Sequence, residues 1–139
     1  MGTDQHCTTC PTLIPYLTVS NTKESISLYQ KAFGFKWLNE AEMTADGTLD
    51  HVEMQYKDVL IMFAGEGCFG STKRTFTKLG AESPMTLYFY CDDVDQMHNT
   101  AVVSGMQSLM EPNDAHWGDR VCILKDPDGY EWMFAKRIG

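Results

Sequence analysis

A histidine and a glutamate two positions apart are the residues of this sequence best suited to chemistry. His51 and Glu53 lie in the β-rich run from Leu49 to Tyr56, and alternate residues of a strand share a face, so Gln55 lies beside them. An imidazole next to a carboxylate can move a proton or supply two donors to a metal ion. A strand His and Glu are more often an ordinary surface or hydrogen-bonded pair, and both interpretations stay open.

Aromatic side chains form a second candidate group. Tyr88 and Tyr90 share one face of the predicted strand from Thr86 to Cys91, and Trp117 lies in a loop before a later strand. Their rings can stack on planar ligand groups, although tyrosine also suits an exposed pleated surface. The sequence leaves open whether these rings contact a ligand or solvent.

The cysteines do not predict a metal or disulfide site. Cys7 and Cys10 form a C-x-x-C next to His6, but structural zinc takes four ligands, almost always Cys and His. Cys91 and Cys122 lie in apolar runs where a thiol usually behaves as a small buried hydrophobe.

Composition excludes several classes of protein. With 139 residues and 43% hydrophobic content, one packed domain is expected. The 19 acidic and 11 basic residues give a charge of −8, which opposes nucleic-acid binding and either favours a cationic ligand or serves solubility. The polar tail 1–11 is expected to be flexible. Because neither a signal peptide nor a membrane span is visible, we expect a cytoplasmic protein.

The first half of the chain has the pattern β-α-β-β-β. A helix is predicted from the N-cap Asn21, with Glu24 three residues later, to the stop residue Gly34. Asp46-Gly47 and Lys57-Asp58 are turn sequences. The strands are predicted at Leu13–Val19, Phe35–Met43, Leu49–Tyr56 and Val59–Ala64.

The second half repeats this pattern. Asp93 is the predicted N-cap of its helix, Gly105 ends the helix, and Asp126–Gly129 is a turn sequence. The pattern indicates an internal duplication of modules 12–64 and 85–137, joined by the linker 65–84, which is expected to be a lid, a short helix or a mobile segment. The strands are predicted at Thr86–Cys91, Gln107–Met110, Arg120–Leu124 and Trp132–Ala135.

Strand parity predicts a ligand cavity. Val52 and Met54 make one face of their strand apolar, as Leu87 and Phe89 do in theirs, and these faces are expected to carry the helices. The opposite faces would then line a concave cavity, unless they simply meet solvent. The predicted lining residues are Tyr16, Thr18, His51, Glu53, Gln55, Tyr88, Tyr90 and Met133, with Trp117 nearby.

Two segments carry a family resemblance. Residues 14–21 (Ile-Pro-Tyr-Leu-Thr-Val-Ser-Asn) and 27–35 (Ser-Leu-Tyr-Gln-Lys-Ala-Phe-Gly-Phe) resemble the opening of the vicinal oxygen chelate superfamily, which includes glyoxalases, bleomycin-resistance proteins and dioxygenases. Residues 117–132, with Asp126–Gly129 as the most specific piece, resemble the closing strands of its PhnB-like or bleomycin-resistance-like branch. The resemblance implies an α+β fold in which two βαβββ modules form a curved mixed sheet around a concave cavity.

The resemblance also implies four metal-ligand positions, which align with Ile14, Glu53, Thr86 and Met133. Only Glu53 is a good ligand for a hard divalent ion, so no metal and no other cofactor is expected. His51 as a replacement donor, or a metal completed by a partner subunit, are the remaining alternatives.

The family therefore implies a metal-independent protein that binds a small cationic or aromatic compound, with Glu53 or Asp119 as the partner of a cation. The alternative is a lyase or isomerase in which Glu53, assisted by His51, is the catalytic base or part of a degenerate metal site. Arg120 can bind an anion, but a salt bridge with Asp119 or Asp126 is the simpler role. A homodimer is expected from the resemblance, and neither nucleic acid nor membrane is an expected partner.

Overall fold

The computed structural model describes residues 11–43 and 49–139, so the Cys7/Cys10 pair with His6 and the predicted Asp46-Gly47 turn lie outside the described residues. The chain divides into two compact units. Of the described residues, 11–30 and 34–74 form the first unit, and 31–33 and 75–139 form the second.

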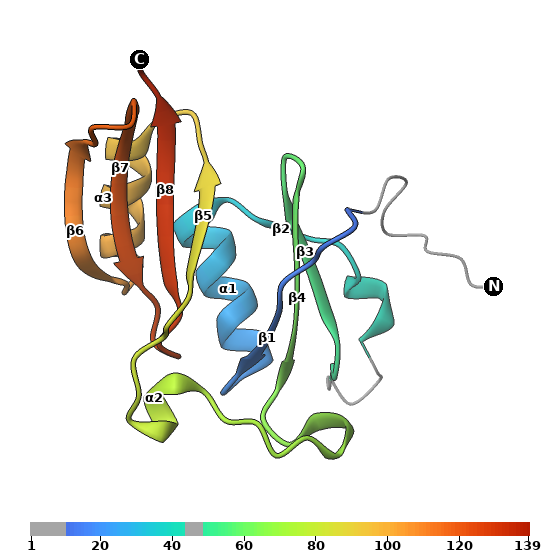
Figure 1. The fold of residues 1–139 in the computed structure, drawn as a ribbon. Helices are drawn as coiled ribbons and strands as arrows, with labels where there is room; N and C mark the ends of the chain where they lie inside the picture. The colour runs from blue at the N-terminus through green and yellow to red at the C-terminus, as the bar shows by residue number, and fades with distance from the viewer. Residues whose placement is uncertain (1–10, 44–48) are drawn as a thin grey trace. The chain divides into compact units, whose positions relative to one another are not determined.

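The first unit contains a four-stranded mixed sheet in the order β1-β4-β3-β2, with β1 parallel to β4 and the other neighbours antiparallel (Figure 1). One α-helix and two short 3-10 helices complete it. In chain order the elements are β1 (Tyr16–Val19), α1 (Thr22–Phe33), β2 (Lys36–Trp37), η1 (Glu40–Glu42), β3 (Val52–Tyr56), β4 (Val59–Gly65) and η2 (Cys68–Gly70).

The second unit repeats this topology, with strand order β5-β8-β7-β6 and β5 parallel to β8. The predicted α+β class with two βαβββ modules is therefore confirmed. Its elements are α2 (Phe76–Leu79), β5 (Thr86–Tyr90), α3 (Val94–Val103), β6 (Gln107–Asp114), β7 (Asp119–Lys125) and β8 (Glu131–Arg137).

The two long helices begin at the predicted caps. The side chain of Asn21 accepts a hydrogen bond from the Glu24 backbone N–H, and that of Asp93 does the same for Gln96. Gly34 ends α1 with a positive φ of 74°, a conformation that favours glycine.

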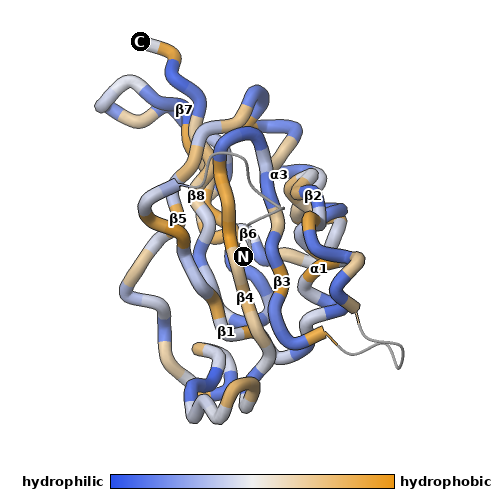
Figure 2. Tube along the Cα trace, turned by 90° about the vertical axis from the view of Figure 1, so that its right-hand side faces the viewer, coloured by the Kyte–Doolittle hydropathy of each residue, from blue (hydrophilic) through white to orange (hydrophobic). Residues whose placement is uncertain are grey.

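Alternate strand residues bury the apolar face in both sheets. Val52 and Met54 of β3 are fully buried, and β3 alternates between hydrophobic and hydrophilic colours in Figure 2. In the second unit, the aromatic rings of Phe33 and Phe134 lie 4.8 Å apart, and Phe89 packs edge-on against Phe134 at 4.5 Å. The apolar faces thus form the cores, and the polar faces remain to carry a site.

The predicted strand Phe35–Met43 is wrong beyond Trp37, because β2 covers only Lys36–Trp37 and the chain turns into η1. The physical reason is Asn39, whose buried amide takes over the pairing with β3 that a strand backbone would make. Its Nδ2 donates to the His51 carbonyl at 2.7 Å, and its Oδ1 accepts from the Glu53 N–H at 3.0 Å. The backbone is thereby released from the sheet.

The linker after β4 contains a short helix, α2, that is attached to the turn between β7 and β8. The Thr77 backbone N–H donates to the Asp128 carbonyl, and the Thr77 hydroxyl donates to the Pro127 carbonyl at 2.7 Å. Gly129 has a φ of +99°, and a Cβ on it would lie 2.7 Å from Cβ of Phe76. The glycine therefore permits this close approach.

The motif Asp126–Gly129 also has a structural role. The buried carboxylate of Asp126 accepts the backbone N–H groups of Asp128 and Tyr130 through Oδ1 and the Trp132 indole N–H through Oδ2. It thus organises the turn and anchors a core tryptophan. None of the helices in the described parts of the chain has the length and apolar character of a membrane span.

Candidate functional site

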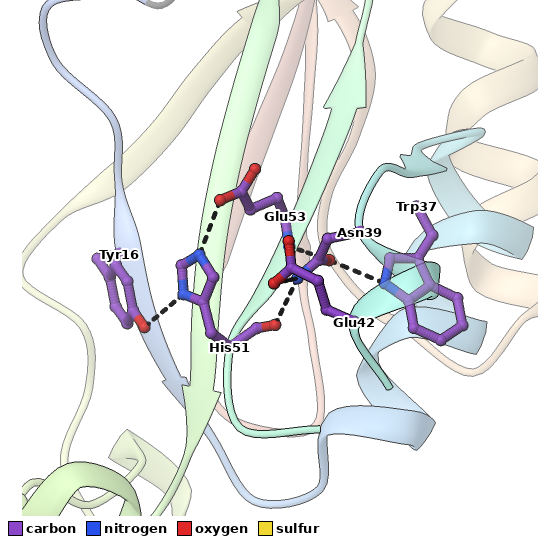
Figure 3. Close-up of polar contacts among 6 residues, drawn as sticks. All are labelled: Tyr16, Trp37, Asn39, Glu42, His51 and Glu53. Atoms are coloured by element: carbon purple, nitrogen blue, oxygen red, sulfur yellow. Dashed lines mark hydrogen bonds and ion pairs between the residues drawn. The ribbon is translucent and has the colours of Figure 1, made fainter. Parts of the chain in front are cut away.

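Three predicted site residues of the first unit are joined by hydrogen bonds (Figure 3). The Tyr16 hydroxyl on β1 lies 2.8 Å from Nδ1 of His51, and Nε2 of His51 lies 2.8 Å from Oε2 of Glu53 on β3. The Tyr16 and His51 rings also stack, with centroids 5.5 Å apart. The result is a continuous chain from Tyr16, a residue that is 52% exposed, to Glu53, a residue that is 8% exposed.

Asn39 fixes the strand end that carries this chain. Besides its bonds to the His51 and Glu53 backbone, its Oδ1 accepts from the Trp37 indole N–H at 3.0 Å, and its Nδ2 lies 3.3 Å from Oε1 of Glu42 (Figure 3). Asn39 is only 1% exposed. An amide with this many bonds is held rigidly, so it holds the backbone on either side of Val52 in place.

The hydrogen-bond chain has a defined direction when the imidazole is neutral. If Nε2 carries the proton and donates to Glu53, then Nδ1 is an acceptor and the Tyr16 hydroxyl donates to it. Burial, followed by the negative charges of Cys68 and Glu53, raises the pKa of Tyr16 above its ordinary value. In this tautomer the Tyr16 hydroxyl donates a hydrogen bond at one end of the chain, and the Glu53 carboxylate accepts one at the other.

The remaining first-unit predictions lie on the same sheet but outside this chain. Thr18 is half-buried on β1, two residues from Tyr16. Gln55 uses its side-chain amide to donate to the Lys57 carbonyl at 2.9 Å, which holds the turn between β3 and β4. Gln55 is thus committed to that turn.

In the second unit, the two predicted tyrosines meet on a buried carboxylate. The hydroxyls of Tyr88 and Tyr90 on β5 donate to Oδ2 of Asp119, at 2.5 Å and 2.8 Å. Asp119 is 1% exposed, and its Oδ1 lies 3.0 Å from Nε of Arg137, an ion pair without the geometry of a hydrogen bond. Asp119 is therefore already neutralised, which argues against the expectation that it pairs with a cationic ligand.

Trp117 and Arg137 complete this second group. The Trp117 indole N–H donates to the Tyr88 hydroxyl at 3.0 Å, and Nη2 of Arg137 donates to the Tyr90 hydroxyl at 3.0 Å. Met133, the β8 partner of Tyr88 in the sheet register, is half-buried beside Tyr88. The predicted residues Tyr88, Tyr90, Trp117 and Met133 are thus gathered on one sheet face.

The ionisable groups in this cluster shift one another's pKa values. The hydrogen bond from Tyr88 is the largest cause that lowers the pKa of Asp119, assisted by Tyr90 and Arg137 against the effect of burial. Burial and the bond to Asp119 raise the pKa of Tyr88. These shifts favour an ionised Asp119 carboxylate and a protonated Tyr88 phenol.

Arg120 has a structural role, although its partners differ from those expected. Its guanidinium makes two hydrogen bonds to Asp95 on α3, at 2.9 and 3.0 Å, and one to Asp114 on β6 at 2.8 Å. The predicted partners Asp119 and Asp126 are instead bonded elsewhere. Arg120 lies next to Asp119 in sequence but points to the opposite face of β7, which explains the error.

The metal positions implied by the family do not fit a metal ion. Ile14 has an aliphatic side chain, Thr86 offers a hydroxyl and Met133 a thioether, none of which suits a hard divalent cation. Glu53 lies on β3, and the residue that holds the place of Met133 in the first sheet is Met62, its cross-strand neighbour. Across the described residues, no three His, Cys, Asp or Glu side chains are grouped to hold an ion.

Sequence reasoning missed Asn39 and Arg137. Asparagine is depleted in strands, so Asn39 inside a predicted strand was the available signal. Arg137 shares the parity of Met133 along β8, and continuing that alternation by four residues would have placed it on the site face.

The topology and the two polar clusters define a duplicated βαβββ protein, and sequence comparison agrees. Residues 5–134 match the Glyoxalase/Bleomycin resistance protein/Dioxygenase superfamily, to which this chain belongs. The uncharacterized protein Mb0911c of Mycobacterium bovis is 28% identical over 130 residues, which cover 92% of this chain and 84% of that protein.

Solved structures share the fold at lower identity. TioX from Micromonospora sp. ML1 superposes with a TM-score of 0.70 at 19% identity, covering 91% of this chain and 98% of TioX. The fosfomycin resistance protein FosX from Mesorhizobium loti has a TM-score of 0.64 at 11% identity, covering 93% of this chain and 92% of FosX.

Proposed function

We propose that this chain is a metal-independent binding protein for a small aromatic compound. The observation that carries the proposal is that exposed aromatic rings are fixed by hydrogen bonds on the polar faces of both sheets. Rings held in one orientation lose little conformational entropy when a planar ligand stacks on them. The proposed ligand-binding residues are Tyr16, Thr18, His51, Glu53, Gln55, Tyr88, Tyr90, Trp117 and Met133.

The contacts favour an aromatic ligand over a purely cationic one. Of the two acids expected to attract a cation, Asp119 is buried and paired with Arg137, and Glu53 is nearly buried and bonded to His51. A cation would have to displace an existing partner to reach either carboxylate. Ring stacking requires no such displacement.

A thermal-shift screen tests the proposal. Protein dialysed against EDTA is heated with proflavine, ethidium, bleomycin and 2-naphthoate, and the melting temperature is compared with that of the free protein. At least one aromatic probe should raise it, since a ligand at 100 times its Kd stabilises by about 2.7 kcal/mol. If no probe changes the melting temperature before metal is added, the proposal is wrong.

Matched variants locate the binding surface. Trp117→Ala should weaken the response to an active probe, because the indole is half exposed and fixed to Tyr88. Phe69→Ala removes another exposed ring, in η2 and outside both faces, and should leave the response unchanged. Equal losses in both variants would show that binding is nonspecific.

A second candidate function rests on the Tyr16, His51 and Glu53 chain. Here Glu53 would accept a proton from a carbon atom of the substrate, whose electron pair remains as an enolate, in an isomerase or lyase reaction. His51 orients the carboxylate, and Tyr16 can donate a proton at the exposed end. Glu53 is the proposed catalytic residue.

Proton exchange tests this candidate without knowledge of the natural substrate. The hemithioacetal of methylglyoxal and glutathione is incubated with the protein in D2O, and loss of its C–H resonance is followed by NMR. Exchange above the buffer rate that disappears in Glu53→Gln would support a base at this position. Exchange that survives in Glu53→Gln, or that never exceeds the buffer rate, counts against it.

We also propose that the chain forms a homodimer, as related domains do. The monomer mass is 15.7 kDa, so light scattering should give about twice that value. A monomer mass at micromolar concentration would refute this part of the proposal.

A further inference from the structure

We propose that the polar face of the second sheet selects planar aromatic compounds that carry an anionic group, with Arg137 as the charge partner. The inference rests on the proposed function and narrows its ligand class. The group that carries it, called here the Arg137 cluster, consists of Tyr88, Tyr90, Trp117, Asp119 and Arg137.

Arg137 keeps one edge of its guanidinium available. Nε faces Asp119 and Nη2 donates to Tyr90, and these contacts fix the plane of the group. Among the residues that the structure describes, none contacts Nη1 within hydrogen-bond distance, and the side chain is 64% exposed. Nη1 and the second N–H of Nη2 therefore present the two parallel donors that a carboxylate or sulfonate accepts.

The backbone beneath Arg137 is also fixed. Arg137 pairs with Asp119 in the register between β7 and β8, and the next residue, Ile138, donates its N–H to the Gly118 carbonyl at 2.8 Å. The guanidinium is thus presented from an ordered strand end. A binding group on a rigid element loses less entropy when a ligand docks.

The aromatic rings beside Arg137 are fixed at their polar ends. Both tyrosine hydroxyls donate to Asp119, and the Trp117 indole N–H donates to Tyr88. The rings of Tyr88 and Tyr90 lie at 75° to each other, 5.8 Å apart. With these polar groups committed, the exposed ring surfaces remain for stacking.

The exposed charge of the Arg137 cluster determines whether an anionic or a cationic ligand is favoured. Asp119 is buried, and its carboxylate accepts hydrogen bonds from the two phenols and forms an ion pair with Arg137. Arg137 and Asp119 together carry no net charge, but the exposed end of this ion pair is the positive guanidinium. Although the whole chain carries a charge of −8, a local fork of donors beside apolar rings favours an anion over a cation of the same shape.

Three naphthalene derivatives of equal ring size test the inference. Isothermal titration compares 2-naphthoate, 2-naphthalenemethanol and 2-(aminomethyl)naphthalene at low ionic strength. The carboxylate should bind about tenfold more tightly than the alcohol, and the ammonium compound no more tightly than the alcohol.

Two variants, each of which removes one positive charge, show which residue causes the preference for the carboxylate. Arg137→Gln should abolish the preference, so that this variant binds 2-naphthoate and the alcohol equally well. Lys136→Gln removes the neighbouring exposed charge, which lies on the other face of β8, and should preserve the tenfold preference. Circular dichroism of both variants checks that the fold is intact.

The outcomes distinguish a failure of the anionic selectivity from a failure of aromatic binding. Equal binding of all three compounds, tighter binding of the ammonium compound, or a preference that survives in Arg137→Gln overturns the anionic selectivity and leaves an aromatic-binding protein. Failure of all three compounds to bind overturns the inference and also counts against the proposed function.

Discussion

The two sheets place a tyrosine at the same position and use it differently. Tyr16 pairs with Met62 across β1 and β4, and Tyr88 pairs with Met133 across β5 and β8. In the first sheet the phenol bonds to an imidazole that bonds to a carboxylate. In the second sheet it bonds directly to a carboxylate that an arginine neutralises.

The comparison shows that the two modules share a backbone plan but differ in the chemistry of their polar faces. The first arrangement ends in a carboxylate that lies behind a proton-exchanging ring, which suits proton transfer or a polar anchor. In the second arrangement the charged groups pair with each other, and aromatic rings and a guanidinium are exposed. The first face therefore exposes a hydrogen-bonded Tyr16, His51 and Glu53 chain, and the second exposes aromatic rings beside a guanidinium.

The largest expected effect concerns Asn39, which replaces strand pairing only in the first sheet. Asn39→Ala leaves the Glu53 N–H and the His51 carbonyl without partners, so we expect a loss of about 3 kcal/mol in the free energy of unfolding. Urea unfolding measures the loss. Hydrogen exchange should show faster exchange in β3 and unchanged exchange in β7.

Asn113→Ala is the matched control in the second sheet. Asn113 lies on β6, which holds the place of β2, but its exposed side chain bonds only to the nearby Glu111 carbonyl. We expect a change of about 0.5 kcal/mol or less. If the two alanine variants lose equal stability, the special role assigned to Asn39 is wrong.

Acid should weaken the second sheet's cluster through Asp119. Because its pKa is lowered in the folded protein, its contribution to stability is complete above the unfolded value of about 3.9 and is lost as the pH falls through the folded pKa. Asp119→Asn cannot titrate, so its stability should fall less between pH 7 and pH 2.5. Urea unfolding at both pH values measures this, with the exposed Glu82→Gln as control. A variant with the same acid dependence as the wild type would contradict the account.

Tyrosine ionisation compares the two faces directly. The pKa values of Tyr16 and Tyr88 are both raised, so each phenol should ionise above pH 10, later than a free tyrosine. Absorbance titration of Tyr16→Phe and Tyr88→Phe should each show the loss of a late-ionising component. Loss of an early component instead would show that the phenol is not held as described.

The smallest effect expected concerns the thiols. Burial raises the pKa of Cys122 to about 12, and Cys91 is also buried, whereas Cys68 in the first unit is half-buried. In a Cys7→Ser, Cys10→Ser background, Ellman's reagent at pH 8 should label Cys68 before the other two. Rapid labelling of all three thiols in folded protein would contradict the buried position of Cys91 and Cys122.

The sequence predicted the elements that depend on local chemistry. Both helix N-caps, the glycine at the end of α1 and the βαβββ order were visible, because capping and alternation are written in adjacent residues. Strand parity also placed His51 with Glu53 and Tyr88 with Tyr90. The strand through Asn39 was mispredicted, because apolar residues surround a side chain whose partners lie 12 and 14 positions away.

The contacts that define the two faces depend on distant pairing. The bond between Tyr16 and His51 spans 35 residues, and the bond between Arg137 and Tyr90 spans 47. Neither partner can be chosen until the register of the strands is known. For the same reason Arg120 could not be assigned to Asp95, which lies 25 positions away on α3.

Aromatic binding without a metal is the central claim, and an NMR titration of EDTA-dialysed protein with 2-naphthoate tests it most directly. The chain has three tryptophans, and therefore three indole N–H resonances. We predict that the Trp117 indole and the β5 and β8 amides near Tyr90 and Arg137 shift with saturation, while the buried Trp132 indole does not. Absence of shifts until zinc or manganese is added, or shifts confined to other elements, would contradict the account.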